Sequence, residues 1–99
     1  MVRHIVAWNY KEGFSELENK ANAQKVQSEL EALPQYIEGI IEMKVYTDLL
    51  PSGNRDIVLN SLFESEEALA AYIVHPAHKR AGEFVRSVTQ DRASFDYNE

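Results

Sequence analysis

Four stretches of strand-like alternation, interleaved with two helical patterns, constrain this chain more than any other feature of its sequence. The strands are predicted over residues 2–10, 37–47, 55–64 and 91–97, and the helical patterns over 15–33 and from 65 to about 85. The resulting order, β-α-β-β-α-β, is that of a split βαβ sandwich with a four-stranded antiparallel sheet. We therefore predict an α+β fold and a single domain covering residues 1–99.

Local signals predict where the helices begin and end. Ser15, with a glutamate three residues later, forms a capping box, and Pro34 ends this first helix. Ser65 can cap the second helix, which Pro76 interrupts near His75 before opening a further helical segment as its first residue. The apolar stripe predicted for the first helix consists of Leu17, Ala21, Val26, Leu30 and Leu33.

Apolar residues fall on both faces of the predicted sheet. In the third strand the two sets are Ile57, Leu59 and Phe63 against Val58 and Leu62, and in the second they are Ile41, Met43 and Val45 against Ile40 and Tyr46. One layer of helices covers only one face of an antiparallel sheet, and a bare apolar face is typical of a partner surface. We therefore predict a homodimer with its two sheets packed face to face. The alternative is an outer face that merely tolerates some apolar residues.

Composition argues against several classes of protein. Sixteen acidic residues against ten basic ones give a net charge of −6, which opposes nucleic-acid binding. The chain has no cysteine, hence no disulfide framework or cysteine-zinc site. No apolar run approaches the roughly 20 residues that span a bilayer, and the N-terminus lacks a signal-peptide layout. We expect a cytoplasmic protein that acts on neither membranes nor nucleic acid.

The residues best suited to chemistry gather around the proline break. Tyr72, His75 and His78 lie within seven residues, and imidazole is the side chain best suited to proton transfer near neutral pH. On the first strand, His4, Val6 and Trp8 share one face and can supply the walls of an apolar hollow. No metal site is predicted, because the histidine spacing lacks a matching carboxylate signature.

Three segments resemble the stress-responsive A/B barrel domain family. They are the opening Val2–Val6, the block Tyr72–His78 with its His-Pro-Ala-His run, and the closing Arg92–Tyr97. The resemblance covers essentially the whole chain. It implies a ferredoxin-like monomer and a dimeric α/β barrel built from two four-stranded sheets.

The resemblance also implies a candidate activity. One plant branch of the family contains a cofactor-free polyketide cyclase, whose catalytic tyrosine and second histidine match Tyr72 and His78, while its pocket histidine matches His4. The sequence departs from that cyclase in its first helix, where Asn22, Ala23 and Val26 replace bulky aromatic residues, and at Ala81, which replaces an aromatic residue near the second histidine. We accordingly take His78 as candidate base, Tyr72 as its partner, and a small aromatic or polyketide-like molecule as candidate ligand. The candidate ligand-binding residues are His4, Val6, Trp8, His75 and Ala81.

Two other functions fit the same sequence. The first is a non-catalytic, stress-related dimer in which His75 caps a helix, Tyr72 and Trp8 fill the core, and His78 faces solvent. The second is a cofactor-independent monooxygenase of the same fold. None of these three functions requires a cofactor.

Overall fold

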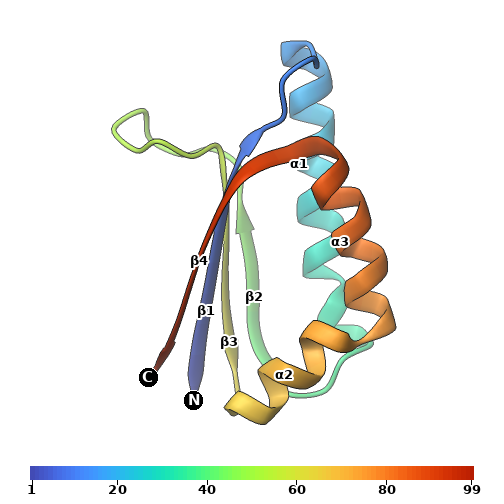
Figure 1. The fold of residues 1–99 in the computed structure, drawn as a ribbon, viewed down its shortest axis with the longest axis vertical. Coiled ribbons are helices and arrows are strands. Elements are labelled where there is room, and N and C mark those ends of the chain that lie inside the picture. Colours follow the sequence, from blue (N-terminus) through green and yellow to red (C-terminus); the bar gives the residue numbers. More distant parts are fainter.

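The strands form one antiparallel sheet. The computed structural model describes residues 1–99. Its strands are β1 (Val2–Tyr10), β2 (Ile40–Tyr46), β3 (Ile57–Phe63) and β4 (Thr89–Asn98), and they lie in the order β2-β3-β1-β4 (Figure 1). Each neighbouring pair is antiparallel. The predicted α+β fold with a ferredoxin-like monomer is confirmed.

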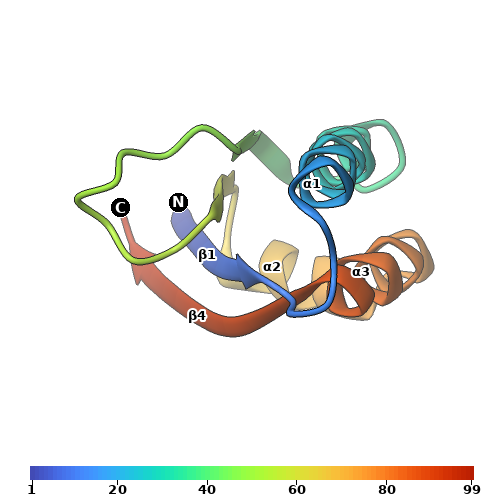
Figure 2. The ribbon, with the colours of Figure 1, turned by 90° about the horizontal axis from the view of Figure 1, so that it is seen from above.

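The helices cover one face of this sheet and leave the other uncovered. They are α1 (Glu16–Glu31), the short 3-10 helix η1 (Leu33–Gln35), α2 (Glu66–Val74) and α3 (Pro76–Val88). Figure 2 shows α1, α2 and α3 on the same side of the strands. The core lies between the two layers, where side chains of β1 and β3 meet those of the helices. None of the helices combines the length and the apolarity that crossing a membrane requires.

The predicted helix boundaries are confirmed at the two serine caps and at Pro76, whereas α1 ends at Glu31, before the predicted end at Pro34, which lies within η1. The Ser15 hydroxyl accepts a hydrogen bond from the Glu18 N–H at 3.1 Å, and the Glu18 carboxylate accepts one from the Ser15 N–H at 2.9 Å. The Ser65 hydroxyl accepts a hydrogen bond from the N–H of Ala68 in the first turn of α2. Helix α2 ends at Val74, and α3 begins at Pro76.

The predicted stripe of α1 was partly wrong. Leu17 is 80% exposed and Ala21 is also exposed, whereas Ala23, Val26 and Leu30 are buried. Successive helical residues are rotated by about 100°, so Leu17 lies about 180° around the helix from Val26. The predicted stripe therefore combined two different faces of the helix.

Strand β2 also differs from its prediction. It begins at Ile40 instead of residue 37, directly after Gly39, which has a φ of 89°. The register with β3 shifts between Ile40 and Glu42, so that Ile40 pairs with Phe63 and packs against the core while Ile41 is 43% exposed. Simple alternation predicts the opposite placement of the two isoleucines, and the irregularity explains the exchange.

The ends of β3 and β4 differ from their predicted positions by one or two residues. Strand β3 is shorter than predicted at both ends, and β4 begins at Thr89, directly after the last residue of α3. An irregularity in the pairing of β1 with β4 lies between Ala7 and Asn9, where Asp91 has a φ of 54°. This irregular start explains why alternation did not predict the first residues of β4.

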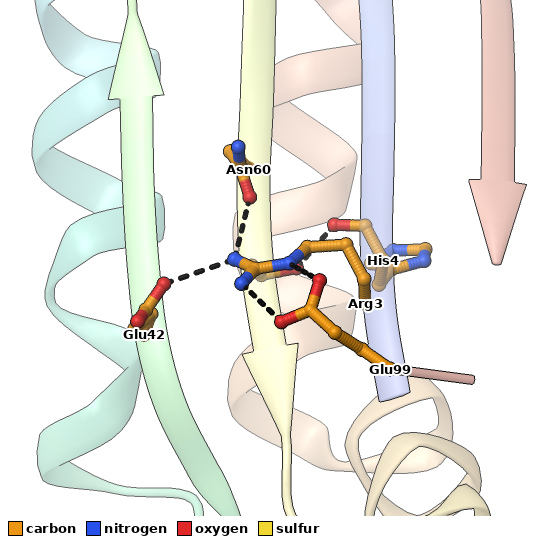
Figure 3. Close-up of polar contacts among 6 residues, drawn as sticks. Arg3, His4, Glu42, Asn60 and Glu99 are labelled. Atoms are coloured by element: carbon orange, nitrogen blue, oxygen red, sulfur yellow. Dashed lines mark hydrogen bonds and ion pairs between the residues drawn. The ribbon is translucent and has the colours of Figure 1, made fainter. Parts of the chain in front are cut away.

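A polar cluster stands on the uncovered face of the sheet. The Arg3 guanidinium bonds the Asn60 side-chain oxygen at 2.9 Å, the Glu42 carboxylate at 2.9 Å, and both oxygens of the Glu99 carboxylate (Figure 3). His4, the next residue, points to the opposite side of β1. The two faces of β1 therefore carry different polar groups.

Candidate functional site

A hollow of about 200 Å³ lies between the helices and the covered face of the sheet. Its walls come from β1, α1, β3, α2, α3 and β4, so residues distant in sequence meet there. Six of the eleven lining residues are hydrophobic. The full set is His4, Val6, Trp8, Leu30, Leu59, Tyr72, His78, Gly82, Val85, Arg86 and Arg92.

Most of the predicted site residues meet in this hollow, and two do not. The residues brought together are His4, Val6, Trp8, Tyr72 and His78. His75 lies outside, where its Nδ1 accepts a hydrogen bond from the Ala77 N–H at 3.0 Å and caps α3. Ala81 is 3% exposed and belongs to a different depression, which α3 shares with the end of α1 and with η1.

The rings of Tyr72 and His78 contact each other across the helix break. Their centroids are 4.3 Å apart and the planes are inclined by 49°. Tyr72 is 1% exposed, and its ring also contacts Phe63, with the centroids 4.9 Å apart. The extended conformation of His75 separates the two helices, which brings one ring from each helix to the same point. The local sequence around Pro76 therefore sets this pair.

One hydrogen bond fixes the protonation pattern of His78. Its Nδ1 lies 3.1 Å from the carbonyl oxygen of Ile73, which can only accept. In the neutral ring the proton must therefore be on Nδ1, and Nε2 carries the free lone pair. Burial lowers the pKa of His78 below its ordinary value, although the bond to Ile73 opposes this shift. The ring is neutral near pH 7 and can accept a proton at Nε2.

Tyr72 remains a proton donor under the same conditions. Burial raises the pKa of its hydroxyl well above the ordinary value, so the phenol stays protonated. The hydroxyl has no hydrogen-bond partner within the chain, which leaves it able to donate to a ligand oxygen. The pair therefore combines a neutral base with a neutral donor, both facing a mostly apolar space.

His4 is held by a carboxylate on the neighbouring strand. Its Nδ1 donates to the Asp96 side chain, which lies opposite it in the pairing of β1 with β4. The ring is 5% exposed, and its centroid lies 6.2 Å from that of Tyr72. The carboxylate fixes the ring orientation, so His4 presents Nε2 as its free nitrogen.

Sequence reasoning missed six of the lining residues. These are Leu30, Leu59, Gly82, Val85, Arg86 and Arg92. Leu30 and Leu59 were recognised as apolar, but alternation and helical periodicity do not separate core from pocket wall. Arg86 lies four residues after Gly82, and this spacing could have indicated a shared helix face toward the hollow.

Comparison with known proteins agrees with this architecture. Residues 2–99 match the family model described as the Stress Responsive A/B Barrel Domain. The chain belongs to this family. The resemblance stated from the opening, middle and closing segments is thereby confirmed. A comparison with curated proteins found no match.

Solved structures similar to this A/B barrel domain cover nearly all of it. A dimeric ferredoxin-like protein of unknown function from Bacteroides fragilis has 28% identity and a TM-score of 0.90, covering 99% of this chain and 95% of its own. A dimeric ferredoxin-like protein of unknown function from Thermobifida fusca has 23% identity and a TM-score of 0.83, with coverages of 99% and 90%. A hydroxynitrile lyase from Passiflora edulis has 20% identity and a TM-score of 0.80, with coverages of 97% and 90%. At these identities the last two show a shared fold.

Proposed function

We propose that this A/B barrel domain forms a homodimer through the uncovered face of its sheet and acts as a cofactor-free lyase or cyclase. The ligand would be a small aromatic or polyketide-like carbonyl compound bound in the hollow of each protomer. The observation that carries the proposal is the geometry of His78, whose Nδ1 is committed to Ile73 while its ring contacts Tyr72. The similarity in fold to a hydroxynitrile lyase supports the same class of chemistry.

The proposed reaction uses His78 as base and Tyr72 as donor. Nε2 takes a proton from the carbon next to a carbonyl group, and the electrons of the C–H bond form an enolate. The Tyr72 hydroxyl donates a hydrogen bond to the enolate oxygen, where the negative charge develops. The enolate carbon then bonds to a second carbonyl carbon, and the oxygen of that group takes the proton from the imidazolium. A lyase would catalyse the reverse of this bond formation, the cleavage of the same carbon–carbon bond.

The other lining residues would position the ligand. His4, fixed by Asp96, offers a further polar contact, and Val6 and Trp8 provide apolar contact area on the same strand. A few convergent polar groups within apolar walls is the usual composition of a small-molecule site. The apolar walls also exclude water, which strengthens each hydrogen bond to a developing charge.

The binding site can be tested by NMR on protein labelled at histidine. We expect aromatic and polyketide-like carbonyl acids to shift the imidazole signals of His78 and the ring signals of Tyr72. His78→Gln should abolish turnover of any compound that binds. His75→Asn is the matched control, because it removes the neighbouring histidine outside the hollow and retains a side chain that can cap α3.

The alternatives give different results. In a non-catalytic dimer, His78→Gln would change thermal stability but no compound would bind or turn over. A cofactor-independent monooxygenase would consume oxygen with a quinol substrate, whereas a lyase or cyclase would not. No signal change at Tyr72 or His78 with any tested compound would refute the proposed site.

The proposal of a homodimer rests on exposed apolar residues on the uncovered face of the sheet. Phe95 is 61% exposed, Tyr97 is 48% exposed and Tyr46 is 47% exposed, and Ile5 lies opposite Phe95 in the strand pairing. A monomer would leave these aromatic side chains in water, beside the polar cluster of Arg3. The relative from Bacteroides fragilis, which is described as dimeric, supports the same assembly here.

The oligomeric state gives a direct test of this part. Phe95→Glu should convert the dimer to a monomer in sedimentation or light-scattering measurements, because it places a charge among the exposed aromatic side chains of the proposed interface. Leu17→Glu is the matched control, since Leu17 is 80% exposed on α1, away from the sheet. Equal masses for the two variants would contradict the proposed interface.

A further inference from the structure

The charged residues that line the hollow are both arginines, and the carboxylate next to this lining, that of Asp96, is bonded to His4. Arg86 from α3 and Arg92 from β4 are the lining residues with a permanent charge, and none of the eleven lining residues carries a carboxylate. Neither arginine has an ion-pair partner anywhere in the chain, although acidic residues outnumber basic ones by sixteen to ten. The hollow therefore has a positive rim in an otherwise acidic protein.

Gly82 allows the Arg86 guanidinium to lie close to α3. A Cβ atom built on Gly82 would be 3.0 Å from Nη1 of Arg86, which is tighter than an ordinary contact. The two residues are four positions apart, so they share one face of the helix. Because Gly82 and Arg86 both line the hollow, the guanidinium lies over this face of α3 at the edge of the site, where Arg86 remains exposed.

The pairing irregularity at the start of β4 places Arg92. From Asp96 opposite His4 and Ser94 opposite Val6, alternation puts Arg92 on the covered face, next to the residue with positive φ. The one hydrogen bond of its guanidinium is a long contact of 3.4 Å to the Ser94 hydroxyl. Such irregularities commonly re-aim side chains next to functional sites. Arg92 thus retains most of its donors for a ligand.

The field of these arginines reaches the catalytic candidates. Both oppose protonation of His78 and add to the lowering of its pKa by burial, and Arg92 partly offsets the raised pKa of Tyr72. Both arginines are exposed, so water and salt screen part of this field, while the apolar walls of the hollow screen it less. A bound anion would neutralise the field and would make His78 a stronger base.

We infer that the hollow selects organic acids, with the ligand carboxylate bound by Arg92 and Arg86 and the reacting carbon directed toward His78. The inference rests on the proposed small-molecule site and specifies its substrate class. The planar guanidinium matches a carboxylate through two parallel hydrogen bonds, which distinguishes acids from neutral compounds of the same shape. Arg92 is the main anchor, because it lines the hollow from β4 on the same strand face as Ser94 and Asp96.

A pair of isosteric probes tests the inference on the unmodified protein. We expect 4-hydroxybenzoate to bind at least about tenfold more tightly than 4-hydroxybenzamide in calorimetric titrations, as charge-assisted hydrogen bonds are stronger than neutral ones. The preference should decrease with added salt. If the amide binds as tightly and shifts the His78 signals equally, the charge selection is refuted while the proposed site stands. If neither probe shifts His78 or Tyr72, both the selection and the site are refuted.

Variants assign the selection to particular residues. Arg92→Gln should weaken the binding of 4-hydroxybenzoate by about tenfold and leave the binding of 4-hydroxybenzamide unchanged. Arg86→Gln should have a smaller effect of the same kind. Arg80→Gln is the control, because Arg80 is an exposed arginine of the same helix that does not line the hollow. If all three variants weaken benzoate binding equally, the cause is the change in the net charge of the protein, and the inference is overturned.

Discussion

Among the glycines, Gly39 is the position where one added methyl group should lower the stability of the fold most. Its φ of 89° lies in the region that side chains other than glycine rarely adopt, and a Cβ built there would be 2.7 Å from the Cβ of Ala68. Ala68 belongs to α2, the helix that carries Tyr72. The close approach of Gly39 to Ala68 thus seats this helix against the start of β2.

Two separate contributions determine the stability that Gly39→Ala is expected to lose. The positive φ should cost about 1–2 kcal/mol for an alanine, and the steric overlap should add about 1–3 kcal/mol. Gly13→Ala isolates the first contribution, because Gly13 has a φ of 102° but nothing within 4 Å of a built Cβ. We therefore expect Gly39→Ala to destabilise the fold by about 1–3 kcal/mol more than Gly13→Ala.

Chemical denaturation followed by the fluorescence of Trp8 would measure both losses. The protein concentration must be the same for all variants, since the proposed dimerisation would make apparent stability depend on it. Adding Ala68→Gly to Gly39→Ala removes the overlapping methyl group, so the double variant should be more stable than the sum of the single losses predicts. This explanation of the contact would be refuted if the stability losses of Gly39→Ala and Ala68→Gly were additive in the double variant. Equal stability losses for Gly39→Ala and Gly13→Ala would also refute it.

Three further measurements address the cap and the two catalytic candidates. Ser15→Ala should lower the free energy of unfolding by about 1 kcal/mol through loss of the capping box, whereas Ser28→Ala, at an exposed position within α1, should have almost no effect in the same denaturation experiment. Tyr72→Phe should change stability by less than about 0.5 kcal/mol, because the hydroxyl has no partner in the chain, yet it should abolish turnover. Since burial lowers the pKa of His78, the unfolded chain binds more protons in acid, and stability should fall as the pH drops below 6.5, the ordinary pKa of histidine. His78→Gln should reduce that pH dependence, and an unchanged dependence would contradict the depressed pKa.

The sequence was most informative where local chemistry dictates the backbone. Ser15, Ser65 and Pro76 each act within one helical turn, and all three produced the predicted boundaries. Errors arose where the outcome depends on distant partners. The exchange of Ile40 and Ile41 follows from the irregular pairing of β2 with β3, which no local pattern encodes.

The site was predictable to the extent that its residues lie on regular elements. Alternation placed His4, Val6 and Trp8 on one face of β1, and the proline break brought Tyr72 close to His78. The two arginines of the rim depend on the irregular start of β4 and on the space above Gly82, which are tertiary features. Arg86 and Arg92 were consequently missed.

Arg3 and His4 are consecutive residues that serve opposite sides of one strand (Figure 3). Inserting or deleting a single residue before Arg3 would turn every following side chain of β1 over, so that the imidazole and the guanidinium would exchange sides. The exposed residues 50–54 between β2 and β3 carry no such restriction, because loops at the surface tolerate changes in length. Epitope tags and grafted peptides therefore belong in that loop, while β1 must keep its present length.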